Sequence, residues 1–299
     1  MSKINVIGAS CIDILISNID KNDFFSNKHK VDKIKMSFGG DALNETVVLS
    51  HFKADTRLIS VLGNDDAGKQ VLEYLKAKNV SYNSNIINND IETYISLVFV
   101  EENGERTFVG NKNGSVRKLK YEDIHIDDDC EIVSFASLFI SPELDNNVLN
   151  KLFKEIKDRN IVLCVDCSTP KNNETVYDMT CLKYADYFFC NESEAKALCK
   201  TDNIEEIYTI FKENGINVII KCGSKGAYYN DQYYDADALN TVVDSTGAGD
   251  SFITGFVLGL YENKPIEKCI RQGNLFGYKA CEYLGATDWI IMSNVIKLI

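Results

Sequence analysis

The segment 241–255 constrains the fold of this chain more than any other part of the sequence. Its apolar start at Val242 and Val243 predicts the end of a β-strand, and Gly247 and Gly249 permit a tight turn that approaches a ligand closely. Apolar residues then recur at the spacing of a helix. The segment is therefore expected to run from a strand through a glycine-rich turn into a helix.

The first turn of this expected helix predicts an anion site, because its amides have no partners within the helix and carry partial positive charge. The amides of Gly247, Ala248 and Gly249 would line that site. Asp250 follows them, although a carboxylate repels a phosphate. A carboxylate at this place can instead take the proton from a hydroxyl while that hydroxyl attacks phosphorus. The alternative is an aspartate that only caps the helix, but the Gly-Ala-Gly-Asp arrangement favours catalysis.

The composition excludes several classes of partner. The chain has 299 residues and a formal net charge of −12, which disfavours nucleic acid and anionic membranes as partners. Its length fits one large α/β domain with an appendage, or two domains. No apolar run is long enough for a signal peptide or a membrane span, so we expect a cytoplasmic protein.

The ten cysteines predict buried thiols rather than disulfides or metal ligands. Cys130, Cys164, Cys190 and Cys222 lie within or beside apolar runs, which is typical of buried, reduced cysteines. Cys164 and Cys167 form a lone Cys-x-x-Cys pair with no second pair and no nearby histidine. A zinc site is therefore not expected.

Apolar runs that favour strands recur along the chain and alternate with helical patterns, for example at 147–158 and 205–213. Strands that alternate with helices imply a doubly wound, mostly parallel sheet with helices on both faces, which is an α/β fold. The runs lie at 4–8, 57–62, 132–135, 161–165, 187–190 and 218–221.

Two regions break this alternation and predict a small second sheet. Residues 12–16 and 30–36 have the pattern of extended segments around a polar loop, and residues 94–100 and 107–109 that of a β-hairpin. The expected core then comprises residues 1–11, 37–92 and 112–299. The discontinuous small β-sheet comprises residues 12–36 and 93–111.

Polar residues after the first strand are candidates for binding a hydroxylated ligand. Asp13 follows that strand, and ligands of α/β sheets bind beyond the carboxyl ends of the strands. Gly39 and Gly40 admit close approach, and Asn44 offers both a donor and an acceptor. The structural alternatives are a solvated aspartate in a turn and a glycine-rich entry to a helix.

Two further strand ends carry groups that suit a nucleotide and a hard cation. Asn191 and Glu194 follow the strand at 187–190, and their oxygens suit a Mg²⁺ ion that keeps its waters. The alternative there is an ordinary acidic helix N-terminus. The turn after the strand at 218–221 can line phosphates and ribose, or it can be a simple hairpin turn. Its candidate residues are Lys221, Gly223, Ser224 and Gly226.

In their order along nearly the whole chain, these motifs resemble the signature of the ribokinase family of sugar kinases, the phosphofructokinase-B type. The resemblance implies a doubly wound α/β core, a small β-sheet lid over the sugar, and transfer of the γ-phosphoryl group of ATP to a sugar hydroxyl with Mg²⁺. It makes Asp250 the base. The sugar would be bound by Asp13, Gly39, Gly40 and Asn44, the nucleotide by Asn191 and the 221–226 turn, and Mg²⁺ by Glu194 through water.

The resemblance also assigns residues that no pattern singles out. Arg106 lies where a lid residue contacts the substrate in related kinases that prefer keto or acid sugars, although an arginine at a hairpin tip is usually just solvated. Asn274 matches a position on the helix beside the adenine. The lid of the family often forms a dimer surface, which implies a homodimer. The positions that correspond to a monovalent-cation site, implying K⁺, are Asp244, Thr246, Ala280, Tyr283 and Gly285.

Two departures from the family bear on the substrate. Residues 166–170 lack the Asp-x-Asn-x-Arg pattern of many members, and the stretch at Phe139 and Ile140 lacks the acidic substrate contact of typical ribose kinases. Both disfavour ribose, and fructokinase-like activity is the first expectation. Alternatives are 2-keto-3-deoxygluconate, fructosamine, ribose or a nucleoside as the substrate. The alternative outside enzymes is an inactive sugar or nucleotide sensor on a kinase scaffold.

Overall fold

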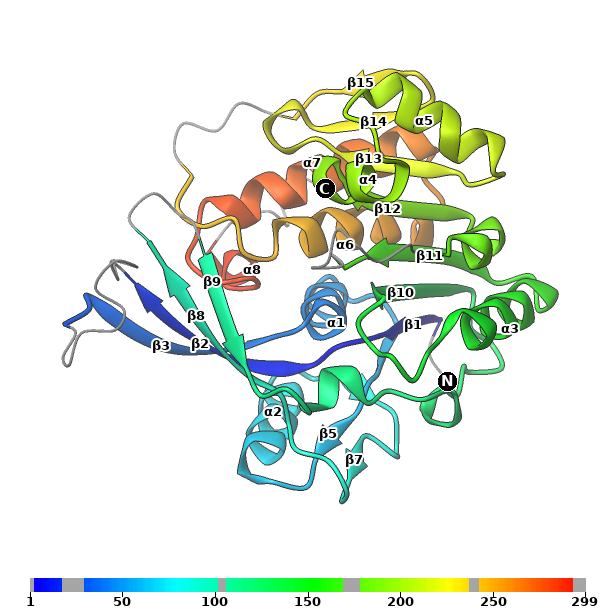
Figure 1. The fold of residues 1–299 in the computed structure, drawn as a ribbon. Helices are drawn as coiled ribbons and strands as arrows, with labels where there is room; N and C mark the ends of the chain where they lie inside the picture. Colours follow the sequence, from blue (N-terminus) through cyan, green and yellow to red (C-terminus); the bar gives the residue numbers. More distant parts are fainter. Residues whose placement is uncertain (1–2, 18–29, 102–105, 169–177, 237–241, 293–299) are drawn as a thin grey trace.

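A large sheet organises the chain, as the computed structural model shows for residues 3–17, 30–101, 106–168, 178–236 and 242–292 (Figure 1). Within these residues it has nine strands in the order β15-β14-β13-β12-β11-β10-β1-β4-β6. The strands are β1 (Ile4–Ile7), β4 (Thr56–Ile59), β6 (Ser81–Tyr82), β10 (Ile132–Leu138), β11 (Val162–Cys167), β12 (Tyr187–Asn191), β13 (Val218–Lys221), β14 (Ala227–Tyr229) and β15 (Gln232–Tyr234).

The pairing in this sheet is parallel from β13 to β6, and only β14 and β15 pair in antiparallel fashion at one edge. Parallel strands need crossover connections, which helices supply on both faces. The helices are α1 (Asp41–His51), α2 (Asp66–Ala77), α3 (Asn146–Asp158), α4 (Glu192–Cys199), α5 (Ile204–Glu213), α6 (Ala248–Tyr261), α7 (Ile266–Cys281) and α8 (Trp289–Met292). The predicted doubly wound α/β fold is confirmed.

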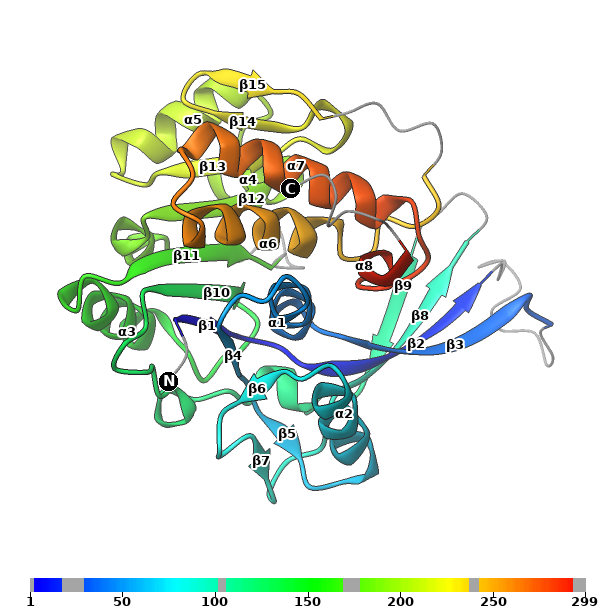
Figure 2. The same ribbon diagram turned by 180° about the vertical axis from the view of Figure 1, so that it is seen from behind.

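Two apolar clusters lie on opposite faces of the sheet, because successive side chains of a strand point to opposite sides. In β10, Ile132 and Ala136 belong to the cluster with α1, α6 and α7, whereas Val133 and Phe135 belong to the cluster with α3, α4 and α5. Figure 2 shows α6 and α7 side by side across one face. Eight of the ten cysteines are buried, as their apolar neighbours predict.

A separate four-stranded sheet projects beyond one end of the large sheet (Figures 1 and 2). Its order is β3-β2-β8-β9, and the two segments that break the alternation of strands and helices supply it. Its strands are β2 (Cys11–Ser17), β3 (Lys33–Gly39), β8 (Ile95–Val100) and β9 (Arg106–Gly110). The prediction of a small second sheet is therefore confirmed.

Short elements complete the described part of the chain. β5 (Leu62–Gly63) pairs with β7 (Ile87–Asn88). The 3₁₀ turns are η2 (Ser115–Arg117), η3 (Tyr121–Asp123), η4 (Thr180–Tyr184) and η5 (Gly223–Lys225). Among the described residues, no helix has the length and apolar character that crossing a membrane requires.

Two predictions of strands need correction. The run at 57–62 is not one strand, because β4 ends at Ile59 and β5 begins at Leu62. Val242 and Val243 form no strand at all: both side chains are more than half exposed, and the Val243 amide donates to the Cys281 carbonyl at the end of α7 at 2.9 Å. The backbone of this segment thus bonds to a helix end instead of a neighbouring strand, so its apolar residues do not extend the sheet.

Candidate active site

A cleft of about 450 Å³ lies between the small sheet and the carboxyl ends of β11, β12 and β13. This is the edge at which parallel α/β sheets bind ligands. The cleft brings together most of the residues that the sequence analysis selects for sugar, phosphate and cation. They are Asp13, Gly40, Asn44, Asn191, Glu194, Lys221, Thr246, Gly247, Gly249 and Asp250.

Asp250 lies in the first turn of α6, and Asn44 of α1 holds it. The Asn44 Nδ2 atom donates to Asp250 Oδ2 at 2.7 Å. Gly247 precedes the helix with φ of 70° and makes no side-chain cap, and a Cβ atom there would lie 2.5 Å from the Ala286 side chain. Only glycine fits this turn. Asp250 is thus not the residue that caps the helix, and its carboxylate faces the cleft.

Burial raises the pKa of Asp250, while the hydrogen bond from Asn44 and the charge of Lys221 lower it, and the net direction is upward. A carboxylate with a raised pKa is a stronger base than an ordinary aspartate. Asp250 can therefore accept a proton from a hydroxyl that is held within hydrogen-bonding distance.

Asp41, the first residue of α1, is a second buried carboxylate in the cleft, and the sequence analysis missed it. Its Oδ2 accepts hydrogen bonds from Ser137 Oγ at 3.1 Å and from Ser168 Oγ at 2.5 Å. Burial, and then the charge of Asp250, raise the pKa of Asp41 to about 7. A charged residue directly after the Gly39–Gly40 pair is the signal that could have identified it.

Lys221, at the end of β13, supplies the positive charge of the cleft, and Asp166 at the end of β11 holds it. The Lys221 Nζ atom lies 2.8 Å from Asp166 Oδ1, and the two side chains are only 14% and 6% exposed. Burial lowers the pKa of Lys221, but the carboxylates of Asp166, Glu194 and Asp250 raise it above its usual value. The ammonium therefore stays charged. Asp166 begins the stretch 166–170 that otherwise departs from the family pattern, and its pairing with Lys221 is visible only in the structure.

The ammonium of Lys221 adjoins the start of α6. A Cβ atom on Gly249 would lie 3.4 Å from Lys221 Nζ. A lysine ammonium and the free amides of a helix N-terminus together favour an anion. The residues around Gly247 and Gly249 can therefore hold a phosphoryl group next to Asp250.

Asn191 and Glu194 form a capping box at the start of α4. Asn191 Oδ1 accepts from the Glu194 amide at 2.9 Å, and Glu194 Oε2 accepts from the Asn191 amide at 2.8 Å. These bonds fix a carboxylate in the wall of the cleft, where it fits a hydrated Mg²⁺ ion. Among the described residues, no three metal-ligating side chains cluster as a metal cage would require.

Asp13 lines the part of the cleft nearest the small sheet. Its carboxylate lies against Gly39, where a Cβ atom would be 2.0 Å from Asp13 Oδ2, so a side chain at that position would displace the carboxylate. Burial raises the pKa of Asp13 to about 6. Ser96 of the small sheet, Tyr94 just before β8, and Ile140 line the same cleft. This end can bind a ligand with several hydroxyl groups.

Asp244 joins the two loops in which the sequence analysis places a monovalent cation. Its Oδ1 accepts from the amide and hydroxyl of Thr246 at 2.9 and 2.6 Å, and its Oδ2 accepts from the Gly285 amide at 3.0 Å. Ala280 lies in the last turn of α7 and belongs to the cluster of buried residues, and the partly buried Tyr283 follows the helix. The bonds of Asp244 bring the loop at 244–246 against the loop that contains Gly285.

Other selected residues lie outside the cleft wall. Asn274 donates to the Tyr234 carbonyl at 2.7 Å and so ties α7 to β15. Gly223 and Ser224 are exposed in η5 beyond β13, and Gly226 follows them. Arg106 begins β9 opposite Val100, and its side chain lies outside the described part of the structure.

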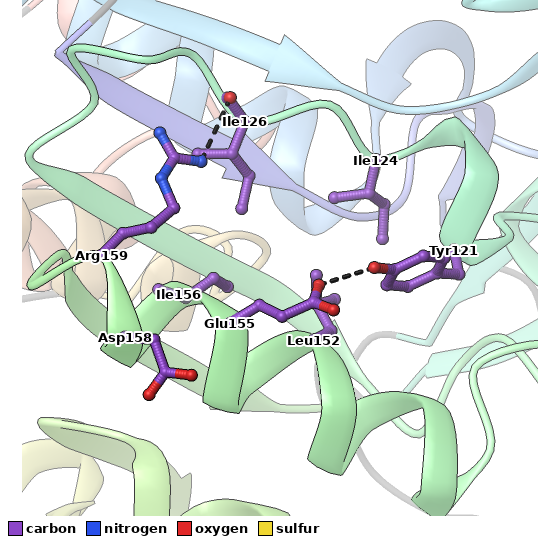
Figure 3. A pocket seen from close by; sticks show the side chains of 8 residues that line it. All are labelled: Tyr121, Ile124, Ile126, Leu152, Glu155, Ile156, Asp158 and Arg159. Atoms are coloured by element: carbon purple, nitrogen blue, oxygen red, sulfur yellow. Dashed lines mark hydrogen bonds between the residues drawn. The ribbon is translucent and has the colours of Figure 1, made fainter.

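A second hollow lies on the outer side of α3, and its polar groups already bind one another (Figure 3). The Tyr121 hydroxyl donates to Glu155 at 2.6 Å. Arg159 donates to the carbonyls of Ile126 and Asp127 at 3.3 and 2.6 Å. These bonds fasten the η3 segment to α3. The hollow therefore lacks the convergent, unsatisfied groups that the cleft offers.

Comparison with known proteins identifies the family to which this fold and cleft belong. The chain belongs to the pfkB family of carbohydrate kinases, whose model matches residues 1–291. It is therefore a phosphotransferase that acts on a hydroxyl group of a sugar. The recognition of this family from the sequence motifs is confirmed.

Several characterised proteins are similar over most of the chain. The 2-dehydro-3-deoxygluconokinase of Haemophilus influenzae is 28% identical over 291 residues, which cover 87% of this chain and 91% of that protein. The ribokinase of Dictyostelium discoideum is 27% identical over 299 residues, covering 91% and 92%. The structure of Arabidopsis thaliana ribokinase with ribose and ATP matches with a TM-score of 0.78 and 20% identity, covering 97% and 96%.

The position of Asp250 predicts that Asp250→Asn abolishes turnover while the fold and ATP binding are retained. Loss of a general base typically lowers the rate by about 10²–10⁴-fold. Steady-state release of ADP measures kcat, and calorimetry measures ATP binding. Asp158→Asn, at an exposed position of α3 away from the cleft, serves as the control. Activity within about threefold of the unmodified enzyme would refute the role of Asp250.

The coupling of Asp41 and Asp250 predicts the pH dependence. Because both carboxylates have raised pKa values, the base is lost at a higher pH than an ordinary aspartate would be. Removal of one carboxylate makes the other easier to ionise. Profiles of kcat/KM against pH should therefore show that Asp41→Asn moves the acidic limb to lower pH. A limb that stays in place or moves upward contradicts the coupling.

Proposed function

We propose that this enzyme transfers the γ-phosphoryl group of ATP to a hydroxyl of a sugar that lies between the small sheet and α6. The observation that carries the proposal is the hydrogen bond from Asn44 to Asp250, which holds a buried carboxylate beside a helix N-terminus. The names of the relatives, a 2-dehydro-3-deoxygluconokinase and ribokinases, support a sugar as the acceptor. The ribokinase solved with ribose and ATP supports ATP as the donor.

In the proposed reaction, Asp13, Gly40 and Asn44 hold the hydroxyl groups of the sugar. Asp250 accepts the proton of the attacking hydroxyl. The amides at the start of α6 and the ammonium of Lys221 stabilise the negative charge on the phosphoryl group during transfer. The small sheet acts as a lid that closes over the sugar, so that water does not replace the sugar hydroxyl as the acceptor of the phosphoryl group.

We also propose the binding sites of the nucleotide and the ions. The nucleotide lies along Asn191, Lys221 and the η5 turn with Gly223, Ser224 and Gly226, and Asn274 positions the wall beside the adenine. Mg²⁺ neutralises phosphate charge when bound, and Glu194 holds it through water. K⁺ would lie at the loops that Asp244 joins.

For the substrate we propose a hexose or ketose in preference to ribose, and fructose is the first choice among neutral sugars. Ile140 faces the cleft where ribose kinases place an acidic contact, so a hydroxyl there finds no acceptor. A buried hydroxyl without a partner costs about 1–3 kcal/mol, which is roughly ten- to a hundredfold in specificity. Asp41, which the structure adds to the cleft, is an acceptor for a different hydroxyl.

A substrate panel tests this proposal. ADP release is measured with fructose, ribose, fructosamine and 2-keto-3-deoxygluconate, and kcat/KM for ribose should be about tenfold or more below the best of the others. A tenfold preference for ribose would disprove the interpretation of Ile140. Stoichiometric sugar binding without ADP release from any sugar would instead support the inactive sensor.

We further propose that the outer face of the small sheet joins two copies of the chain. An apolar row crosses all four strands there, because Met36, Ile14, Leu97 and Val109 are successive register partners. Met36 and Val109 are 51% and 47% exposed, and Ile34 is 66% exposed. A contiguous exposed apolar surface of this kind marks an interface.

Light scattering tests this dimer. The unmodified protein should show the mass of two chains, and Ile34→Lys together with Met36→Lys should give one chain, because two charges would be buried without partners. Ile291→Lys is the matched control, since Ile291 is equally exposed at 65% but lies in α8. A monomeric unmodified protein, or a dimer that survives both lysines, would exclude this interface.

A further inference from the structure

A third space, a hollow different from the one at α3, adjoins the sugar end of the cleft at the base of the small sheet. It has a volume of about 500 Å³, and Tyr94, Lys112, Arg117 and Lys118 line it. None of its lining residues is acidic. Three cationic side chains therefore meet at one concave surface of a chain whose net charge is −12. A concave surface of one charge sign concentrates oppositely charged ligands.

These three cations are not used to hold the fold together. Within the part of the chain that the structure describes, the ion pairs involve other lysines and arginines. Lys118 forms a backbone bond to Ser115 in η2, which fixes the loop but leaves its ammonium available. The cationic groups can thus bind a ligand without breaking an ion pair.

Tyr94 forms the wall between this hollow and the cleft, because it lines both. Its ring lies against two glycines: a Cβ atom on Gly110 would be 2.1 Å from the Tyr94 hydroxyl, and one on Gly114 would be 2.5 Å from the ring. Burial raises the pKa of Tyr94, the charge of Asp13 raises it further, and the charge of Arg117 lowers it. Tyr94 is therefore the residue at which the two spaces meet.

The charges of the two spaces are opposite. Asp13, Asp41 and Asp250 line the cleft, and their carboxylates accept hydrogen bonds from hydroxyl groups but repel an anion. The carboxylates near Asp13 disfavour an anionic group on a sugar, whereas the hollow beyond Tyr94, near Arg117, favours one. Such a sugar would bind in one direction, with a neutral hydroxyl at Asp250 and its charged end at the hollow.

We propose that the hollow lined by Lys112, Arg117 and Lys118 is a subsite for an anionic group, a carboxylate or a phosphate, at the end of the sugar farthest from the phosphorylated hydroxyl. This inference rests on the proposed sugar-kinase function and names the class of substrate that the site takes. Guanidinium and ammonium groups form strong, charge-assisted hydrogen bonds with both anions.

Three probes that differ in charge test the subsite: fructose, fructose 6-phosphate and 2-keto-3-deoxygluconate. The unmodified enzyme should prefer one of the two anionic sugars to fructose in kcat/KM, and the preferred probe tells phosphate from carboxylate. Arg117→Gln and Lys118→Gln should each lower that preference by about tenfold or more. Arg117→Lys should retain part of it, and Lys120→Gln, two residues beyond the hollow, should retain all of it.

A preference for fructose over both anionic sugars would overturn the subsite, and so would an equal loss for all three sugars in Arg117→Gln. If the enzyme releases no ADP with any sugar, the proposed function fails. Calorimetry with the same three probes then tests the subsite by binding, without turnover. Tighter binding of an anionic probe than of fructose, weakened about tenfold in Arg117→Gln, supports it. Equal binding of all three probes refutes it.

Discussion

The hydrogen bond between Asn44 and Asp250 is the interaction on which the rest of the site depends. It joins α1 to the first turn of α6, two helices that pack on the same face of the sheet. Asp250 is buried beside free helix amides, so its carboxylate would be costly without a donor. Asn44 supplies that donor and orients the base toward the cleft. In the proposed reaction, sugar binding and phosphoryl transfer therefore meet at this pair of side chains.

Negative and positive groups lie at different ends of the cleft. Carboxylates dominate the sugar end, whereas Lys221 and the N-terminus of α6 provide positive charge where the phosphates would lie. Asp166 makes this arrangement stable, because a buried ammonium needs a close counter-ion. Beyond Tyr94 the charge becomes positive again at Arg117. Opposite charges in adjoining spaces favour a substrate that carries both hydroxyl groups and an anionic group.

Much of the fold could be predicted from local patterns. Apolar runs of four to six residues marked the buried parallel strands, and helical spacing marked α3 and α5 almost to the residue. The pattern misled at Val242 and Val243, because apolar, β-branched residues favour a strand but cannot show whether a neighbouring strand is present. Long-range pairing decides that question, and here the Val243 amide bonds to the end of α7.

The sequence by itself determined the family, the doubly wound fold and the positions of Asp13, Asn44, Glu194 and Asp250, because glycine-rich turns and strand ends are local features. Only the tertiary structure decided which other charges join them. Asp41 lies 96 and 127 residues from its partners Ser137 and Ser168, and Asp166 lies 55 residues from Lys221. No common motif joins these residues, and only the packing of the strand ends brings them together. Burial then set their pKa values, and burial is a property of the packed molecule alone.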